Sequence, residues 1–187
     1  MKKTLGVVAA ATLAAMPILG VGAADLVTTQ TDTLKITVND SCELKYQSTA
    51  HTNGSGTAPG TWSGNTLSAT IANNAADTNI GGTSFHVVCN DNGGYDVKVK
   101  TEALDGAEAG ESIPYITAAS APAAGTSSWG INNGTAWILD EGVVKTAAAA
   151  TDGTDFAVTY GVATSSTLAA DTYEGDAVYT LTHPADK

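Results

Sequence analysis

The chain has 187 residues and is acidic, with 19 aspartate and glutamate residues against eight lysines, no arginine and a formal net charge of −11 at pH 7. Such a surface offers too few cations to neutralise the phosphates of nucleic acids or the headgroups of anionic lipids. The composition therefore argues against a nucleic-acid-binding protein, and it is typical of a protein that stays soluble in an exposed environment.

The first 23 residues are predicted to be a secretory signal peptide. Two lysines precede an apolar, alanine-rich stretch at 5–19, and the small residues at 21–23 offer a cleavage site. A retained membrane anchor is the alternative, but the stretch is short for a membrane-spanning helix and is interrupted by Pro17. We therefore expect a secreted, extracellular or cell-surface protein.

The rest of the chain is long enough for one domain with a buried core. We place an N-terminal strand in residues 24–40 and the domain itself in residues 41–187. The only cysteines are Cys42 and Cys89. Two cysteines in an exported chain are usually bonded to each other, and neither a CxxC redox motif nor a set of zinc ligands is present. The sequence therefore predicts a structural disulfide between them.

Apolar and polar residues alternate with a period of two in several short segments, which is the pattern of strands that bury one face. Loops rich in glycine, asparagine, aspartate, serine and threonine separate these segments, and no long amphipathic helix is predicted. The pattern predicts an all-β sandwich of about seven or eight strands. In chain order the segments are 34–38 with its continuation at 42–46, 67–71, 85–89, 95–99, 129–131, 136–139, 156–162 and 177–183, and 113–116 is a candidate edge strand.

Two connectors are predicted to close β-hairpins. The connector at 90–94 consists of residues that tolerate positive φ, so the chain can reverse between the strands on either side of it. The dipeptide Asn133-Gly134 is a strong signal for a tight turn between two further strands. Residues 47–64 and 73–82 are expected to be loops, because turn-forming residues dominate both stretches.

Some residues could bind a ligand, but none forms a catalytic motif. Trp129 and Trp137 flank the second turn, where they could stack on a sugar or pack against the core, and we favour packing. The carboxylates of residues 102–111 lack the ligand order of an EF-hand, so an exposed acidic loop is preferred to a calcium site. His51 lies in the first predicted loop without an expected partner. We expect no enzymatic activity, no metal and no cofactor.

The order of the short motifs resembles that of spore-coat-U-type proteins and archaic chaperone–usher pilins. In these families an N-terminal strand precedes a cysteine, and a second cysteine ends a V-x-V-x-C strand. A Tyr-x-V-x-V strand, a Tyr-Gly element and a final G-x-Y element follow. The matching positions span nearly the whole predicted mature chain: Leu34–Val38, Cys42, Phe85–Cys89, Tyr95–Val99, Val158–Gly161 and Asp171–Gly175, leading to Leu181-Thr182.

This resemblance implies an immunoglobulin-like sandwich that lacks its last strand, which the N-terminal strand of a neighbouring subunit supplies to build a fibre. Leu34, Ile36 and Val38 are the candidate residues for this strand complementation. Only four residues follow His183, which is fewer than a strand of typical length. The chain departs from the family pattern at Val162, where a charged residue is usual.

We therefore expect a structural subunit of the cell surface, pilin-like or coat-like, that associates with itself. The alternative is a monomeric surface adhesin or carbohydrate-binding sandwich that uses the two tryptophans or the loops to bind a host surface or a glycan. The two hypotheses differ in the partner of Leu34–Val38, which pairs either within its own domain or with another subunit.

Overall fold

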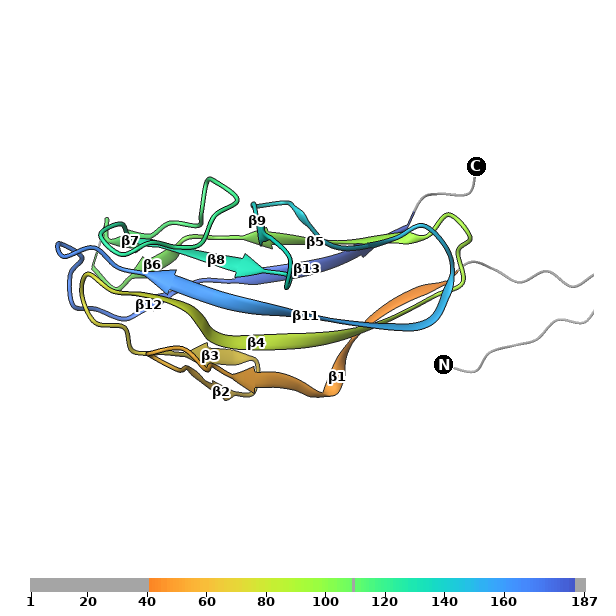
Figure 1. The fold of residues 1–187 in the computed structure, drawn as a ribbon, viewed down its shortest axis with the longest axis horizontal. Coiled ribbons are helices and arrows are strands. Elements are labelled where there is room, and N and C mark those ends of the chain that lie inside the picture. The colour runs from red at the N-terminus through yellow and green to blue at the C-terminus, as the bar shows by residue number, and fades with distance from the viewer. Residues whose placement is uncertain (1–40, 109, 184–187) are drawn as a thin grey trace, which may run out of the picture. The chain divides into compact units, whose positions relative to one another are not determined.

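The computed structural model describes residues 41–108 and 110–183, and their fold is entirely β (Figure 1). No helix that could cross a membrane occurs among these residues. The predicted signal peptide and the Leu34–Val38 segment lie outside the described residues. The predicted class is confirmed: the described part of the chain is an all-β, sandwich-like domain built from antiparallel sheets.

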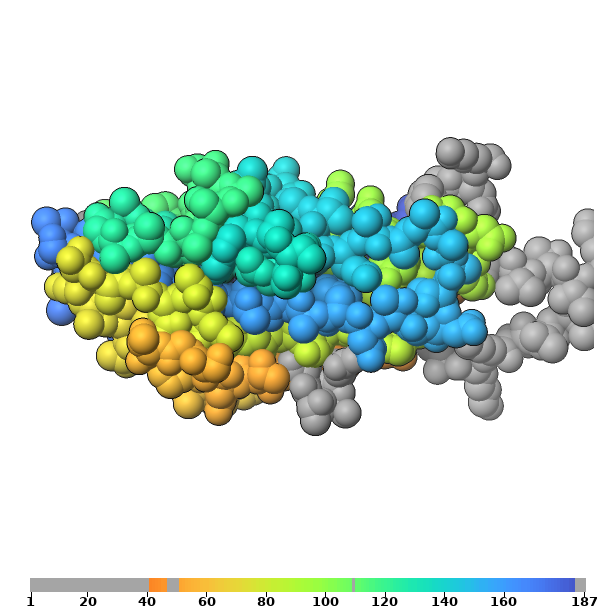
Figure 2. All heavy atoms as spheres, viewed as in Figure 1, coloured from red at the N-terminus to blue at the C-terminus, as the bar shows by residue number. Residues whose placement is uncertain are grey.

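The larger sheet has five strands, each antiparallel to its neighbours. β4 and β11 lie inside the sheet and are its longest strands, and apolar and polar residues alternate in the second half of each. On the face that Figure 2 presents, the atoms of β11 lie beside those of the β8–β9 segment. The order across the sheet is β1 (Cys42–Asn53), β4 (Ala76–Cys89), β11 (Thr151–Ala163), β8 (Ser128–Asn132) and β9 (Trp137–Ile138).

Three smaller sheets complete the fold. The most important for the site has β5 at its centre, in the order β10 (Val143–Ala147), β5 (Tyr95–Thr101) and β13 (Ala177–Thr182). The other two sheets are made of short strands near the loops. They comprise β12 (Tyr173–Glu174), β6 (Leu104–Gly106) and β7 (Ser112–Ile113) in one, and β2 (Thr61–Ser63) and β3 (Thr66–Ser68) in the other.

The hydrophobic core lies between the five-stranded sheet and the β10–β5–β13 sheet. β5 buries every second residue, as the predicted alternation requires, and so does the second half of β4. Phe85 of β4 and Tyr179 of β13 meet across this core with ring centroids 4.6 Å apart. Other buried members are Val87, Cys89, Tyr95, Val97, Val99, Ile131, Val144 and Val158.

The predicted hairpin around residues 90–94 is wrong, because β4 and β5 belong to different sheets and do not pair. Residues 85–89 and 95–99 each bury every second side chain. The apolar faces of the two strands oppose each other across the core instead of lying side by side in one sheet. The turn is real: Gly94 has φ +81°, and its N–H donates to the Asp91 carbonyl at 3.0 Å. The predicted hairpin at Asn133-Gly134 is confirmed by the pairing of β8 with β9.

Two predicted loops contain strand. β1 continues to Asn53, with a register shift between Tyr46 and His51, and β2 follows within the stretch expected to be a loop. β4 begins at Ala76, although residues 73–82 are rich in turn formers. The reason is tertiary: Trp62 and Leu67 of the β2–β3 hairpin pack over Gly81, where an added Cβ would come within 2.7 Å of Leu67.

Candidate functional site

The strongest candidate site is an open groove between β1 and β13. β1 is the edge strand of the five-stranded sheet, and β13 is the edge strand of the three-stranded sheet. Among the described residues, no strand pairs with the free edge of either one. A sandwich open at this position has two unpaired edges beside its core, and native sheet proteins usually cover or otherwise protect such edges.

The free edge of β13 presents the backbone of the same residues whose side chains face the core. The Glu102 N–H donates to the Asp176 carbonyl at 3.2 Å, which fixes the alternation of hydrogen bonds between β5 and β13. In an antiparallel pair, every second residue bonds to the partner and the residues between direct their N–H and C=O groups away. Ala177, Tyr179 and Leu181 are therefore the residues that offer backbone groups to an incoming strand.

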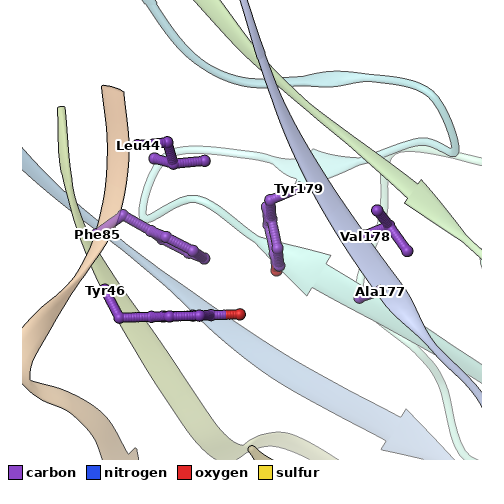
Figure 3. Close-up of a pocket in the computed structure, with 6 residues that line it drawn as sticks. All are labelled: Leu44, Tyr46, Phe85, Ala177, Val178 and Tyr179. Carbon is purple, nitrogen blue, oxygen red and sulfur yellow. The ribbon is translucent and has the colours of Figure 1, made fainter. Parts of the chain in front are cut away.

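The free edge of β1 follows the same rule. The Asn90 N–H donates to the Ser41 carbonyl at 3.1 Å, so Cys42, Leu44 and Tyr46 direct their backbone groups away from β4. Leu44 and Tyr46 also turn their side chains toward the groove (Figure 3). Both walls thus combine free backbone groups with apolar side chains, which is the arrangement required to bind an extended segment.

A hollow of about 320 Å³ lies in this groove. It has about twice the volume of a 150 Å³ apolar cavity that holds benzene, so branched aliphatic side chains fit. Figure 3 shows Tyr46 stacked below Phe85, with Tyr179 facing both rings from β13. Tyr46 and Val178 are 53% and 55% exposed, so an apolar surface remains open to solvent here. The lining residues are Leu44, Tyr46, Phe85, Ala177, Val178 and Tyr179.

A row of hydrogen bonds leads from the hollow to the β2–β3 hairpin. The Tyr179 and Tyr160 hydroxyls lie 3.0 Å apart, and the Tyr160 hydroxyl is 3.3 Å from that of Thr83. The Thr83 hydroxyl is 3.4 Å from His51 Nδ1, and His51 Nε2 is 3.3 Å from Asn65 Oδ1. Burial raises the pKa of Tyr160 and of Tyr179, so both hydroxyls keep their protons at neutral pH.

His51 therefore has partners, contrary to the expectation from the sequence. Its ring stacks on Trp62 with centroids 4.0 Å apart and lies 5.6 Å from the ring of Tyr46. The indole N–H of Trp62 donates to the Thr52 carbonyl at 3.0 Å, which holds the stack in place. His51 thus contacts one wall of the groove through Tyr46 and reaches the other wall through the hydroxyl row.

Both walls of the groove are fastened at the same end of the domain. The predicted disulfide is present: Cys42 of β1 is bonded to Cys89, which is also its partner in the sheet. On the other wall, His183 follows β13 and its Nδ1 lies 3.0 Å from the buried carboxylate of Asp91, in the turn after β4. β1 therefore begins where β13 ends, and the two walls run in opposite directions.

The two predicted ligand-binding tryptophans do not present a pair of exposed rings. Trp129 is 6% exposed, and its indole N–H donates to the Glu102 carbonyl at 3.0 Å. Trp137 is half-buried and lies over Gly161, where an added Cβ would come within 2.7 Å of its ring. No group of three or more His, Cys, Asp or Glu side chains among the described residues could hold a metal ion.

The sequence predicted both strands that form the walls of the groove, but it did not predict the groove itself. Leu44 and Tyr46 alternate after Cys42, and Tyr179 and Leu181 alternate near the end of the chain, so each pair predicts one apolar face. Nothing in the local pattern shows that these two faces lie beside each other at unpaired edges.

Comparisons with known proteins identify no relative: no protein-family model, no curated protein and no solved structure matches the chain.

Proposed function

We propose that this protein is a structural subunit of the cell surface that polymerises by strand complementation. In this proposal the Leu34–Val38 segment of one copy enters the groove between β1 and β13 of the next. The observation that carries the proposal is the groove, whose two walls offer free backbone groups beside an apolar hollow. The motif order that resembles spore-coat-U-type proteins and pilins agrees with this role.

The chemistry of the segment suits the hollow. Leu34, Ile36 and Val38 alternate with polar residues, so an extended segment directs three aliphatic side chains to one face. Burial of each side chain contributes roughly 1.5–3 kcal/mol before ordering costs, and backbone pairing with β13 adds to this. The bound segment would also complete the missing edge of the sandwich and remove a surface that favours unspecific association.

The direction of the walls restricts how the chain's own segment can enter the groove, whereas a second copy is not restricted in this way. To run antiparallel to β13, the segment must run parallel to β1, because the two walls are antiparallel to each other. With Ile36 in the hollow beside Leu44 and Tyr46, Val38 would then lie about 17 Å from the level of Cys42 along β1. The four residue steps from Val38 to Cys42 span at most about 14 Å, so the same chain cannot make this arrangement.

The chain's own segment can enter only in the reverse direction, as a fold-back beside β1 that runs parallel to β13. A second copy has no such restriction and can enter the groove in either direction. The geometry therefore supports head-to-tail association, in which each copy gives one segment and receives another, and which continues into a fibre.

A pair of single substitutions in the segment tests the proposal. Ile36→Asp places a charge on the face that enters the hollow, and Thr37→Asp places the same charge on the opposite face. We expect Ile36→Asp to give a folded monomer and Thr37→Asp to retain the polymer, as seen by gel filtration and negative-stain microscopy. Loss of thermal stability in Ile36→Asp with no change in assembly would show that the segment binds within its own domain.

A further inference from the structure

The row of hydrogen bonds from His51 to Tyr179 has a defined direction. Asn65 Oδ1 accepts a hydrogen bond, so the adjacent Nε2 of a neutral His51 carries the proton and Nδ1 is left as an acceptor. The Thr83 hydroxyl then donates to Nδ1, the Tyr160 hydroxyl donates to Thr83, and the Tyr179 hydroxyl donates to Tyr160. In this state the Tyr179 proton points away from the hollow, into the protein.

Protonation of His51 reverses each hydrogen bond between its Nδ1 and Tyr179, whereas Nε2 still donates to Asn65. Both ring nitrogens then carry protons, so Nδ1 donates to the Thr83 hydroxyl instead of accepting from it. The other hydrogen-bond partner of the Thr83 hydroxyl among the described residues is the Tyr160 hydroxyl, so Thr83 directs its own proton there, and Tyr160 in turn donates to Tyr179. The Tyr179 hydroxyl is left as a donor without its partner, beside the hollow that Tyr179 lines.

We propose that His51 is a positioning residue that sets the direction of the Tyr179 hydroxyl, so that its protonation weakens strand binding in the groove. This inference rests on the proposed function, since it concerns the regulation of the same groove. An aliphatic side chain cannot accept the released hydroxyl proton, and a buried donor without a partner opposes binding. Because such a penalty corresponds to roughly a tenfold loss of affinity, acidification is expected to release the bound strand.

Among the described residues, the hydrogen bonds of this row are the main polar contacts of His51. Among the described side chains, the groups that face its ring are Tyr46 from β1, Trp62 from β2, Asn65 from the β2–β3 turn and Thr83 from β4. None of these side chains is charged at neutral pH. Within the described part of the chain, His51 forms no ion pair, whereas His86 pairs with Asp155 and His183 with Asp91. The other two histidines are therefore suitable controls.

The test measures binding of a peptide to the groove as a function of pH. The peptide comprises residues 33–38 with blocked ends, so its only charge is that of Lys35, which does not change between pH 8 and pH 5. The protein is the full chain with Ile36→Asp, whose own segment does not compete. We expect about tenfold weaker binding at pH 5 than at pH 8. The change should be lost in His51→Gln and in Tyr179→Phe, and retained in His86→Gln.

Each result has one meaning. No binding at either pH contradicts the proposed function itself. Binding that does not depend on pH, or a pH dependence that survives in His51→Gln, overturns the role of His51. A pH dependence that is lost in His51→Gln but remains in Tyr179→Phe overturns the connection to the Tyr179 hydroxyl. Nitrogen-15 NMR of the imidazole adds an independent check: the proton of neutral His51 should be on Nε2, and a proton on Nδ1 would contradict the direction of the row.

Discussion

The hydroxyls of Tyr160 and Tyr179 lie 3.0 Å apart, and this contact joins the two main sheets beside the groove. Tyr160 belongs to β11 of the five-stranded sheet, and Tyr179 belongs to the edge strand β13 of the other sheet. The ring of Phe85, which belongs to β4 of the same five-stranded sheet as Tyr160, also contacts the Tyr179 ring. These contacts attach β13 to the larger sheet although no described strand covers its free edge.

Tyr46 and Phe85 are stacked but should respond differently to truncation. Phe85 is 2% exposed and also stacks on Phe156, so Phe85→Ala is expected to cost about 3–5 kcal/mol of unfolding free energy. Tyr46 is 53% exposed, so Tyr46→Ala should cost only about 1 kcal/mol in the isolated domain but should weaken assembly strongly. Denaturant unfolding and gel filtration of both variants measure the two effects. Unchanged assembly in Tyr46→Ala would remove Tyr46 from the binding surface.

The disulfide between Cys42 and Cys89 fastens one wall of the groove. Replacement of both cysteines by alanine should lower the unfolding free energy by about 2–4 kcal/mol, because the unfolded chain gains freedom. Guanidinium unfolding measures this loss, and addition of reductant should bring the natural chain close to the stability of the double variant. Intact mass after alkylation is the control: two freely alkylated thiols in the native protein would contradict the bond.

Asp77 connects β4 to the loop before β2 and should make stability depend on pH. It is 4% exposed, and its carboxylate accepts hydrogen bonds from the Asn79 N–H at 2.9 Å, the Thr57 hydroxyl at 3.3 Å and the Ala58 N–H. Burial alone would raise the pKa of Asp77, but these hydrogen bonds outweigh it and the pKa is lowered.

Because the folded pKa lies below the unfolded value, this stabilisation is present above about pH 4 and is lost as the pH falls through the folded pKa. Asp77→Asn should therefore cost about 1–3 kcal/mol at neutral pH and approach the natural chain in acid. Urea unfolding between pH 7 and pH 2 measures the difference. The exposed Asp152→Asn is the matched control, and an equal loss in both variants would contradict the role of Asp77.

Gly94 and Gly134 both have positive φ, at +81° and +88°, but only Gly94 is crowded. An added Cβ at Gly94 would lie 1.9 Å from the Ala147 carbonyl oxygen, whereas nothing lies within 4 Å of one at Gly134. Gly134→Ala should therefore cost only backbone strain of about 1–2 kcal/mol, and Gly94→Ala should cost clearly more. Thermal unfolding of the two variants tests this order, and equal losses would contradict the close approach of β10 to the turn.

The sequence was sufficient to predict the strands in which apolar and polar residues alternate clearly, but it missed β10, whose Val144 is buried in the core. Phe85, Val87 and Cys89, and later Tyr179 and Leu181, alternate clearly, and each group lies in a strand at the expected positions. It was not sufficient for the first half of β4. Gly81 and Asp77 look like turn residues, and they lie in a strand because the β2–β3 hairpin covers the glycine and the preceding loop satisfies the carboxylate.

The groove could not be predicted from local pattern for a related reason. The alternation in 85–89 and 95–99 is the same whether two strands pair side by side or face each other across a core. The structure has the second arrangement, which places β13 beside β1 and leaves an edge free on each. Leu44 and Tyr179 are far apart in sequence and line the same hollow only because the chain changes sheets at residues 90–94.

The most direct test of head-to-tail strand complementation is to mix two defective variants. Ile36→Asp removes the donated segment but keeps the groove, and Ala177→Phe fills the hollow but keeps the segment. Circular dichroism first confirms that both variants fold. Gel filtration with light scattering should then show each variant alone as a monomer and their mixture as a one-to-one heterodimer that grows no further. Two unmixed monomer populations would contradict the account, because each segment would then bind within its own chain or not at all.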